Sequence, residues 1–289
     1  MSVDEILRSI KRESAWRPAE SPGNEENSDE THGSSRHANT PTAGRRDQNS
    51  PGQLESSSDE TVPRSFVNSL GHRLVRIPET QALFSVWPVR VADYQAFVFE
   101  TGRSWKAAGF PQNPNHPAVR ISYHDAGDFC RWLTQRERQS NKLPPGFEYR
   151  LPRDLEWSAA AGISEKSEGP PAWRSGAIPD CFPWGDSWPP PPGSGNYDGR
   201  LKADAYAYTS PVGSFAPNKL GLYDMSGNVF EWVADDFDES GLGCLRGGSW
   251  PDESPVNLNL STRCQDNKTT AHKCYGFRFV LAPVGSGVH

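Results

Sequence analysis

The chain has 289 residues, enough for one large domain or two small ones. Only 35% of the residues are hydrophobic, and 26 glycines stand beside 26 prolines, so part of the chain must be loop-dominated or unstructured. The net charge of −6 and the absence of a basic block argue against a nucleic-acid partner. No apolar run approaches the roughly 20 residues of a membrane-spanning helix, so no membrane partner is expected either.

The first 63 residues divide into two parts. Residues 1–13 carry Val3, Ile6, Leu7 and Ile10 at helical spacing, which predicts a short amphipathic helix. It is too short to be stable alone, so it is either a docking motif that folds on a partner protein or a frayed end without a role. Residues 14–63 are polar and acidic, and predict a disordered linker. The start of the chain lacks the basic and apolar regions of a secretory signal, which predicts a cytoplasmic protein.

Residues 64–283 are expected to form one domain, followed by a tail at 284–289. Aromatic residues become frequent there, and turn sequences recur without a fixed period. We expect strands at 66–78 and 83–88, helices at 91–101, 122–139 and 153–161, and mostly loops and short strands after Gly162. Ser122 is placed to cap the second helix, whereas Arg90 offers the first helix no side-chain oxygen. A domain with so few regular elements needs a further source of stability.

The five cysteines form no CxxC pair and in a reducing compartment are expected to be free thiols: Cys130, Cys181, Cys244, Cys264 and Cys274. The sequence also lacks a nucleophile elbow, a phosphate-cradling glycine loop and an HExxH motif. These absences remove the common hydrolase, nucleotide-binding and zinc-protease interpretations.

Seven segments, in order, resemble the formylglycine-generating enzyme (sulfatase-modifying factor) family. They are Asn-His-Pro-Ala-Val (115–119), Tyr-Arg-Leu-Pro with Glu-Trp (149–157), Phe-Pro-Trp-Gly (182–185), Pro-Val-Gly-Ser-Phe (211–215), Gly-Leu-Tyr-Asp-Met-Ser-Gly-Asn-Val-Phe-Glu-Trp (221–232), Leu-Arg-Gly-Gly-Ser-Trp (245–250) and Gly-Phe-Arg-Phe (276–279). The resemblance covers about residues 66–281. It implies an α+β fold, a loop-rich variant of the C-type lectin-like fold with little regular secondary structure.

The resemblance also implies two structural calcium sites, and the residue types agree because calcium prefers carboxylate and carbonyl oxygens. The first set is Asn196, Asp204 and the backbone carbonyls of Tyr197 and Tyr206. The second set is Asp224, Glu231 and the carbonyls of Gly227 and Val229. The alternative to calcium binding is that Asn196 and Asp204 only cap turns, and that Glu231 accepts hydrogen bonds from neighbouring backbone amides. Calcium would be the stabilising element that the loops lack.

The resemblance to the formylglycine-generating enzymes implies that activity would rest on two cysteines downstream of the Gly-Gly-Ser motif. As thiolates, these cysteines bind a cuprous ion. In this chain those positions fall near Pro255 and Leu260, neither of which can ligate copper. Copper is therefore not expected. Cys264 and Cys274 could form a catalytic pair only in a rearranged loop. That alternative, a copper-dependent oxidoreductase acting on a peptide cysteine, predicts a low thiol pKa.

The segment from Trp250 to Lys273 forms a long polar run beside an aromatic residue, and on a rigid scaffold such a loop is suited to recognition. The candidate binding residues are Trp250, Asn257, Asn259, Arg263, Gln265, Asp266 and Asn267. We therefore expect a non-catalytic lectin-like module that binds a protein or small ligand at about 250–275. An ordinary solvated loop remains open, as does a retroelement-diversified binding protein, which DNA context alone would reveal.

Overall fold

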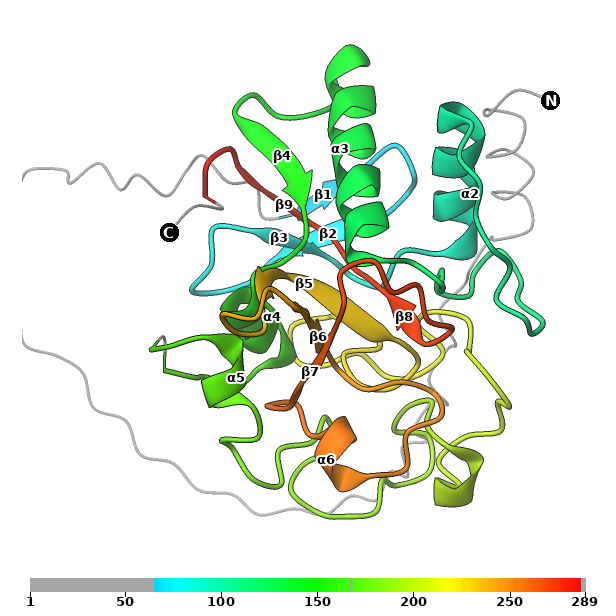
Figure 1. Cartoon of the computed structure of the whole chain (residues 1–289), viewed down its shortest axis with the longest axis vertical. Helices are drawn as coiled ribbons and strands as arrows, with labels where there is room; N and C mark the ends of the chain where they lie inside the picture. Colours follow the sequence, from blue (N-terminus) through cyan, green and yellow to red (C-terminus); the bar gives the residue numbers. More distant parts are fainter. Residues whose placement is uncertain (1–64, 167, 287–289) are drawn as a thin grey trace, which may run out of the picture. The chain divides into compact units, whose positions relative to one another are not determined.

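The computed structural model describes residues 65–166 and 168–286 (Figure 1). The helix expected at 1–13, the linker expected at 14–63 and the last three residues of the tail lie outside these ranges. Within these ranges the strands are β1 (Ser65–Val67), β2 (Arg73–Arg76), β3 (Leu83–Ser85), β4 (Phe147–Arg150), β5 (Phe230–Asp236), β6 (Gly243–Arg246), β7 (Arg263–Asp266), β8 (Tyr275–Gly276) and β9 (Val280–Pro283). The helices are α2 (Val91–Thr101), α3 (Tyr123–Gln139), α4 (Asp154–Ala161), α5 (Pro171–Arg174), α6 (Pro255–Leu258) and the 3₁₀ turn η1 (Gly199–Leu201).

The first sheet has five strands in the order β1-β2-β3-β9-β4, and its neighbouring strands are antiparallel. The single strand expected at 66–78 is wrong, because a tight turn divides it into β1 and β2. The side chain of Asn68 accepts hydrogen bonds from the amides of Leu70 and His72 at 3.0 and 2.9 Å. Gly71 then takes a positive φ of 79°, which favours glycine. The strand expected at 83–88 ends at Ser85.

The second sheet has four strands in the order β7-β6-β5-β8. Its neighbours are antiparallel except for β5 and β8, which run parallel. This order places β7 and β8 at opposite edges of the sheet, although only eight residues separate them along the chain.

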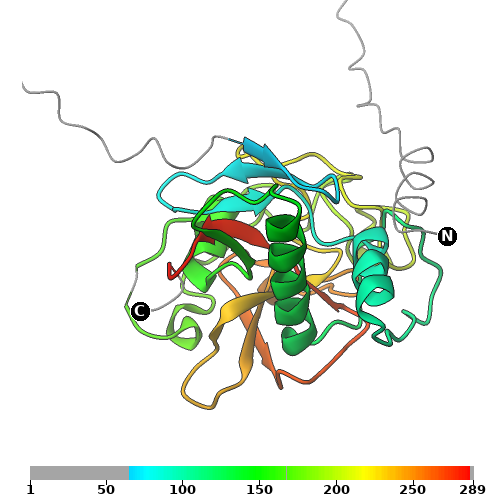
Figure 2. The same ribbon diagram turned by 90° about the horizontal axis from the view of Figure 1, so that it is seen from above.

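Both long helices begin where the sequence predicts, but their N-termini are stabilised differently. The hydroxyl of Ser122 accepts a hydrogen bond from the Asp125 amide at 3.1 Å. At α2 the carbonyls of His116 and Pro114 take the place of a cap oxygen, accepting hydrogen bonds from the Val91 and Ala92 amides at 2.8 and 3.0 Å. The carboxylate of Asp93 accepts hydrogen bonds from the Arg90 amide and the Arg90 guanidinium, both at 2.9 Å. The ring Nε2 of His72 lies 2.6 Å from the same carboxylate. Figure 2, which looks down on the molecule, shows α2 and α3 side by side.

The core occupies both faces of the central strands. Along β9, Leu281 packs in one apolar cluster with Phe97, Phe129 and Phe279, and its neighbour Val280 packs in a second cluster. The same alternation separates Trp232 from Val233 on β5, because successive side chains of a strand point to opposite faces. These packed layers and the long loops confirm the α+β, loop-rich fold expected from the sequence.

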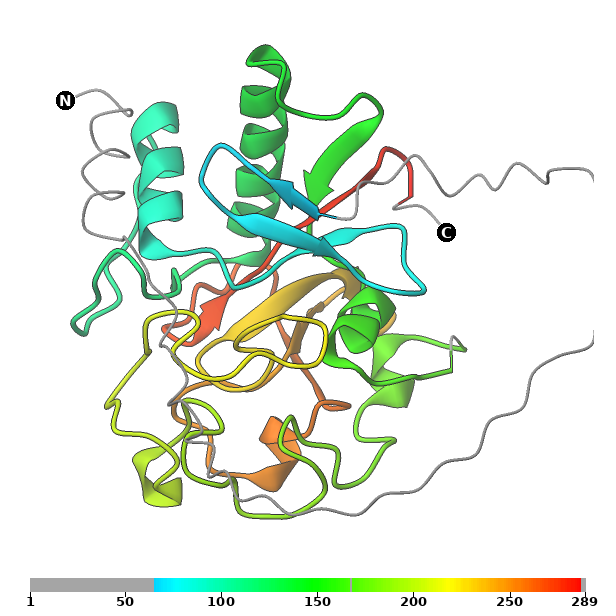
Figure 3. The ribbon, with the colours of Figure 1, turned by 180° about the vertical axis from the view of Figure 1, so that it is seen from behind.

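The residues between α5 and β5 form long loops in which η1 is the one helical turn among the described residues (Figure 3). Asn228 ties these loops together: its amide donates to the Asn196 carbonyl at 2.9 Å, and its side-chain oxygen accepts from the Ser210 amide at 3.1 Å. A Cβ on Gly227 would lie 2.4 Å from the Asn196 carbonyl oxygen, so glycine is required there. Within the described ranges, none of the helices combines the length and apolar character needed to cross a bilayer.

Candidate recognition surface

Two aromatic rings from distant segments, those of Phe110 and Tyr208, gather around Trp250. The rings of Phe110 and Tyr208 stack with centroids 4.7 Å apart and 2° between their planes. The Trp250 ring meets them edge-on, with centroids 5.8 and 5.2 Å away. The Lys273 ammonium lies 5.3 Å from the Trp250 ring centroid. Tyr208 is 41% exposed, so the cluster borders solvent. The indole nitrogen of Trp250 is buried without a hydrogen-bond partner in the described structure.

The polar run beside this cluster is partly exposed and partly used to shape its own turns. Gln265 and Asn267 are exposed. The Asp266 carboxylate accepts hydrogen bonds from Tyr275 and Thr270, each at 2.9 Å. Asn257 donates to Asp252 at 2.7 Å. The structure brings Lys273 to the aromatic cluster and leaves several other polar side chains of the run accessible. We refer to these residues together as the recognition surface: Phe110, Tyr208, Trp250, Asn257, Gln265, Asp266, Asn267 and Lys273.

Two residues of the expected binding set do not belong to this surface, because their side chains are buried. Asn259 is 8% exposed and donates to the Ile178 carbonyl at 2.9 Å. Arg263 is 4% exposed and lies in a buried ion cluster. Polar residue type alone suggested solvent exposure at both positions. Their partners lie more than 80 residues away along the chain, so the sequence run could not reveal them.

The ion cluster around Asp154 is a feature that the sequence did not predict. Its carboxylate accepts hydrogen bonds from Arg174 and Arg263, each at 2.8 Å, and also from Arg246. Arg263 pairs in addition with Glu165, whose Oε1 lies 2.6 Å from Nη1. Burial alone would raise the pKa of Asp154, but the charges of Arg246 and Arg263 and their hydrogen bonds hold it well below its usual range. The cluster fastens α4, α5, β6 and β7 together.

Cys264 and Cys274 lie far apart in the second sheet. Cys264 is on β7 and Cys274 directly precedes β8, so β6 and β5 separate them. Three strand spacings of about 4.8 Å place the two edges roughly 14 Å apart, well beyond the reach of a disulfide or of one shared metal ion. The structure therefore does not form the shifted catalytic pair that the sequence left open.

The environment of each thiol also disfavours the thiolate. Burial, followed by the charge of Asp252, raises the pKa of Cys264 to about 11. Burial likewise raises the pKa of Cys274 to about 11. Near the two positions that the sequence resemblance assigns to catalytic cysteines, Pro255 begins α6 and Leu260 is buried in the core. A low thiol pKa, which the oxidoreductase alternative requires, is not found at either cysteine.

The first expected calcium set presents several oxygen atoms that could hold a cation. Asn196 is 1% exposed, and its side-chain oxygen has no hydrogen-bond partner in the described structure. No described backbone amide donates to the carbonyl of Tyr197 or Tyr206. The Asp204 carboxylate accepts hydrogen bonds from the amides of Tyr197 and Tyr206 at 2.9 and 2.7 Å, which leaves further lone pairs. An orphaned buried amide oxygen, and a carboxylate that is hydrogen-bonded to the next residue along the chain, are ligand types that fit a calcium ion.

The second expected set does not fit as well, because Glu231 is already occupied. Its two carboxylate oxygens accept a bidentate pair of hydrogen bonds from Arg278, both at 2.7 Å. Trp157 donates to the same carboxylate at 2.8 Å. Burial raises the pKa of the remaining acid, Asp224, to about 6, and its carboxylate accepts a hydrogen bond from the Gly213 amide at 2.8 Å. A guanidinium in the ligand shell would repel calcium, so Glu231 is better described as the buried partner of Arg278.

Comparison with known proteins agrees with this architecture. An inactive C-alpha-formylglycine-generating enzyme 2 from Mus musculus is 31% identical over 182 residues, which are 59% of this chain and 51% of that protein. The formylglycine-generating enzyme of Thermomonospora curvata is 32% identical over 153 residues, covering 46% of this chain and 40% of that one. The chain thus spans about half the length, or less, of these relatives.

Both inactive and active proteins are therefore among its relatives. The solved structure of PvdO from Pseudomonas aeruginosa aligns with a TM-score of 0.49 and 25% identity, covering 70% of this chain and 80% of that one. Residues 51–283, most of the chain, match the family described as the sulfatase-modifying factor enzyme 1-like domain. The chain belongs to this family.

Proposed function

We propose that this protein is a non-catalytic binding module on the formylglycine-generating enzyme scaffold, and that the recognition surface holds its ligand. The observation that carries the proposal is the state of the two cysteines nearest the family's catalytic segment. They lie on opposite edges of one sheet, and each has a raised thiol pKa. Oxidation of a peptide cysteine at a shared cuprous ion would require two adjacent thiolates.

The aromatic cluster supports a ligand at this surface. Stacked and edge-on rings present a large, rigid contact area at low cost in conformational entropy. Gln265 and Asn267 add exposed hydrogen-bonding groups on the same polar run, and Lys273 adds a positive charge beside the Trp250 ring. The unpaired indole N–H of Trp250 is a donor that a ligand carbonyl would satisfy after a small movement of the ring. A protein loop or a peptide supplies both apolar side chains and carbonyl oxygens.

A selection from a displayed random-peptide library tests this proposal. Peptides enriched on the full chain should lose binding to a Trp250→Ala, Tyr208→Ala double variant. They should keep their binding to Trp173→Ala, which removes a tryptophan that is 78% exposed and lies outside the recognition surface. Enriched peptides that bind the double variant equally well would place the ligand elsewhere and overturn the proposal. A library that yields no enriched peptide would also overturn it, because the surface would then bind no peptide.

Titration with copper(I) tests the absence of catalysis directly. We expect the reduced chain and its Cys264→Ala, Cys274→Ala double variant to show the same thiolate-to-copper absorbance and the same negligible oxygen uptake. Stoichiometric copper binding that the double variant loses, with oxygen uptake on a thiol peptide, would restore the oxidoreductase alternative.

We also propose that calcium stabilises the loops at the first set. Asn196, Asp204 and the carbonyls of Tyr197 and Tyr206 would hold the ion, which would supply structure rather than chemistry. Added calcium should raise the melting temperature of the wild-type chain, and a chelator should reverse the rise. Asn196→Ala should abolish this response, whereas Asn218→Ala, a loop asparagine outside the set, should keep it. A melting temperature that is indifferent to calcium and chelator would contradict the site.

A further inference from the structure

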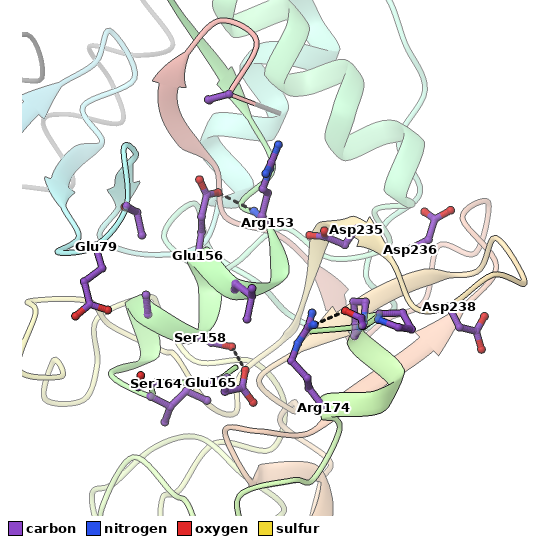
Figure 4. A pocket seen from close by; sticks show the side chains of 18 of the residues that line it. Glu79, Arg153, Glu156, Ser158, Ser164, Glu165, Arg174, Asp235, Asp236 and Asp238 are labelled. Atoms are coloured by element: carbon purple, nitrogen blue, oxygen red, sulfur yellow. Dashed lines mark hydrogen bonds between the residues drawn. The ribbon is translucent and has the colours of Figure 1, made fainter. Parts of the chain in front are cut away.

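A cavity of about 920 Å³ opens between α4, α5, the loop after β2 and the end of β5 (Figure 4). None of the residues that line it belongs to the recognition surface, so it is a separate site. We call it the α4–α5 cleft. A cavity of this size lies within the range that small molecules and peptide side chains occupy.

The walls of the cleft carry more carboxylates than cations. Asp235 and Asp238 lie on the side formed by the end of β5, and Glu79 lies on the opposite side, as Figure 4 shows. Together with Glu239 they have no ion-pair partner among the described residues. Burial raises the pKa of Asp235, and a cation placed against it would oppose that shift. The unmatched negative charge favours a positively charged ligand.

Two arginines of the cleft carry buried donors that the protein leaves unpaired. Arg174 is 8% exposed, and its guanidinium binds Asp154 through Nη2 and the Gly169 carbonyl through Nη1. Its Nε–H has no partner in the described structure, and neither does Nη2 of Arg153. Unsatisfied buried donors are costly, and a small rotation of either guanidinium toward the cleft would let an acceptor oxygen of a ligand satisfy it.

The remaining wall is apolar. Leu155, Ile163, Pro170 and Pro171 line the same cavity. Lysine and arginine side chains can lay their methylene stems along such a surface while the charged head reaches a carboxylate. The cleft therefore offers partners for a stem, for a cationic head and for a carbonyl oxygen, three groups that occur together in a basic peptide.

We propose that the α4–α5 cleft binds an extended peptide segment bearing basic side chains. The cationic heads contact Asp235, Asp238 and Glu79, the stems pack on the apolar wall, and backbone carbonyls accept hydrogen bonds from Arg153 and Arg174. A simple diamine would meet the carboxylates but has no acceptor for the arginines, so the donors distinguish the two ligand classes.

Binding of a fluorescent, capped Gly-Lys-Gly-Lys-Gly peptide to the full chain tests the proposal. We expect saturable binding that weakens about tenfold or more in an Asp235→Asn, Asp238→Asn double variant, in which the oxygen that accepts the Asp154 or Ser240 amide is kept. Binding should be unchanged in an Asp186→Asn, Glu253→Gln double variant, which removes two exposed carboxylates outside the cleft. Acetylation of both lysines should abolish it.

Arg153→Leu and the diamine cadaverine complete the test. The substitution should weaken the peptide several-fold, because it removes a donor to the backbone carbonyl. It should not weaken cadaverine, a poorer competitor, because it also removes a positive charge that acts on Asp235. Absence of saturable binding to a peptide, or equal binding by the double carboxylate variant in a chain that unfolds like the wild type, would overturn the site. Equal competition by cadaverine with no effect of Arg153→Leu would show a cation site and overturn the assignment to peptides.

Discussion

Arg278 and Glu231 form an ion pair inside the protein. Glu231 belongs to the sequence motif at 221–232 and Arg278 to the motif at 276–279, but the sequence does not show that the two side chains meet. The guanidinium also donates to the Ser85 and Tyr223 carbonyls at 3.2 and 2.9 Å. One side chain thereby joins β3, the loop before β5 and β5 itself. Isolated buried charges are costly, and this pair is tolerable because nearly every donor and acceptor is satisfied.

Glu231→Gln should therefore lower the free energy of unfolding by about 3–5 kcal/mol, because it leaves the Arg278 guanidinium buried without its counter-charge. Urea denaturation monitored by tryptophan fluorescence measures the change. Arg131→Gln removes an ion pair whose arginine side chain is 68% exposed, and it should leave the midpoint almost unchanged. Equal effects of the two substitutions would show that the buried pair does not hold the loops.

The thiols of Cys264 and Cys274 should react slowly near neutral pH. With a pKa of about 11, about one thiol in a thousand is ionised at pH 8, against about a quarter for an unperturbed cysteine. The thiolate fraction rises with pH, so alkylation by iodoacetamide should accelerate about tenfold per pH unit until pH approaches 11. Mass spectrometry of each cysteine peptide gives the rates, with glutathione as reference. Fast labelling of either cysteine at pH 7 would contradict the buried environment.

Helix α3 was predictable because its signals are local. Its buried stripe, formed by Ala126, Phe129, Cys130 and Leu133, follows the helical period, and Ser122 with Asp125 supplies both halves of the capping box. The hairpin of β1 and β2 was missed although its turn is also local. Alternating residues on both sides of Asn68 predict one strand, and the alternation continues across the turn. Asn68 and Gly71 together were the available signal for the break.

Ser122→Ala should lower the free energy of unfolding by about 1 kcal/mol, because it removes the acceptor for the Asp125 amide at the start of α3. Urea denaturation measures the loss, and Ser122→Thr, which keeps a hydroxyl, should retain most of the stability. A loss in Ser122→Thr as large as in Ser122→Ala would mean that the hydroxyl is not the stabilising group.

At the scale of the molecule, the sequence predicts the domain and its fold through ordered motifs, but not which segments meet. The recognition surface shows this limit. Trp250 was anticipated, whereas its ring partners Phe110 and Tyr208 come from segments 140 and 42 residues upstream. Arg263 shows the converse, since its buried partner Asp154 lies 109 residues away. Contacts of this length depend on the order of the strands, which no periodicity encodes.

The position of β9 has a consequence for how the protein is made. This strand lies between β3 and β4 in the first sheet, although it comes near the end of the chain. During synthesis on the ribosome, β3 and β4 therefore have no partner between them until residues 280–283 have emerged, and the apolar side chains that β9 covers stay exposed until then. Nascent chains stalled at residue 278 should be digested rapidly by added protease, whereas released full-length chains should resist. Protection of the stalled chain would show that the rest of the domain folds without its central strand.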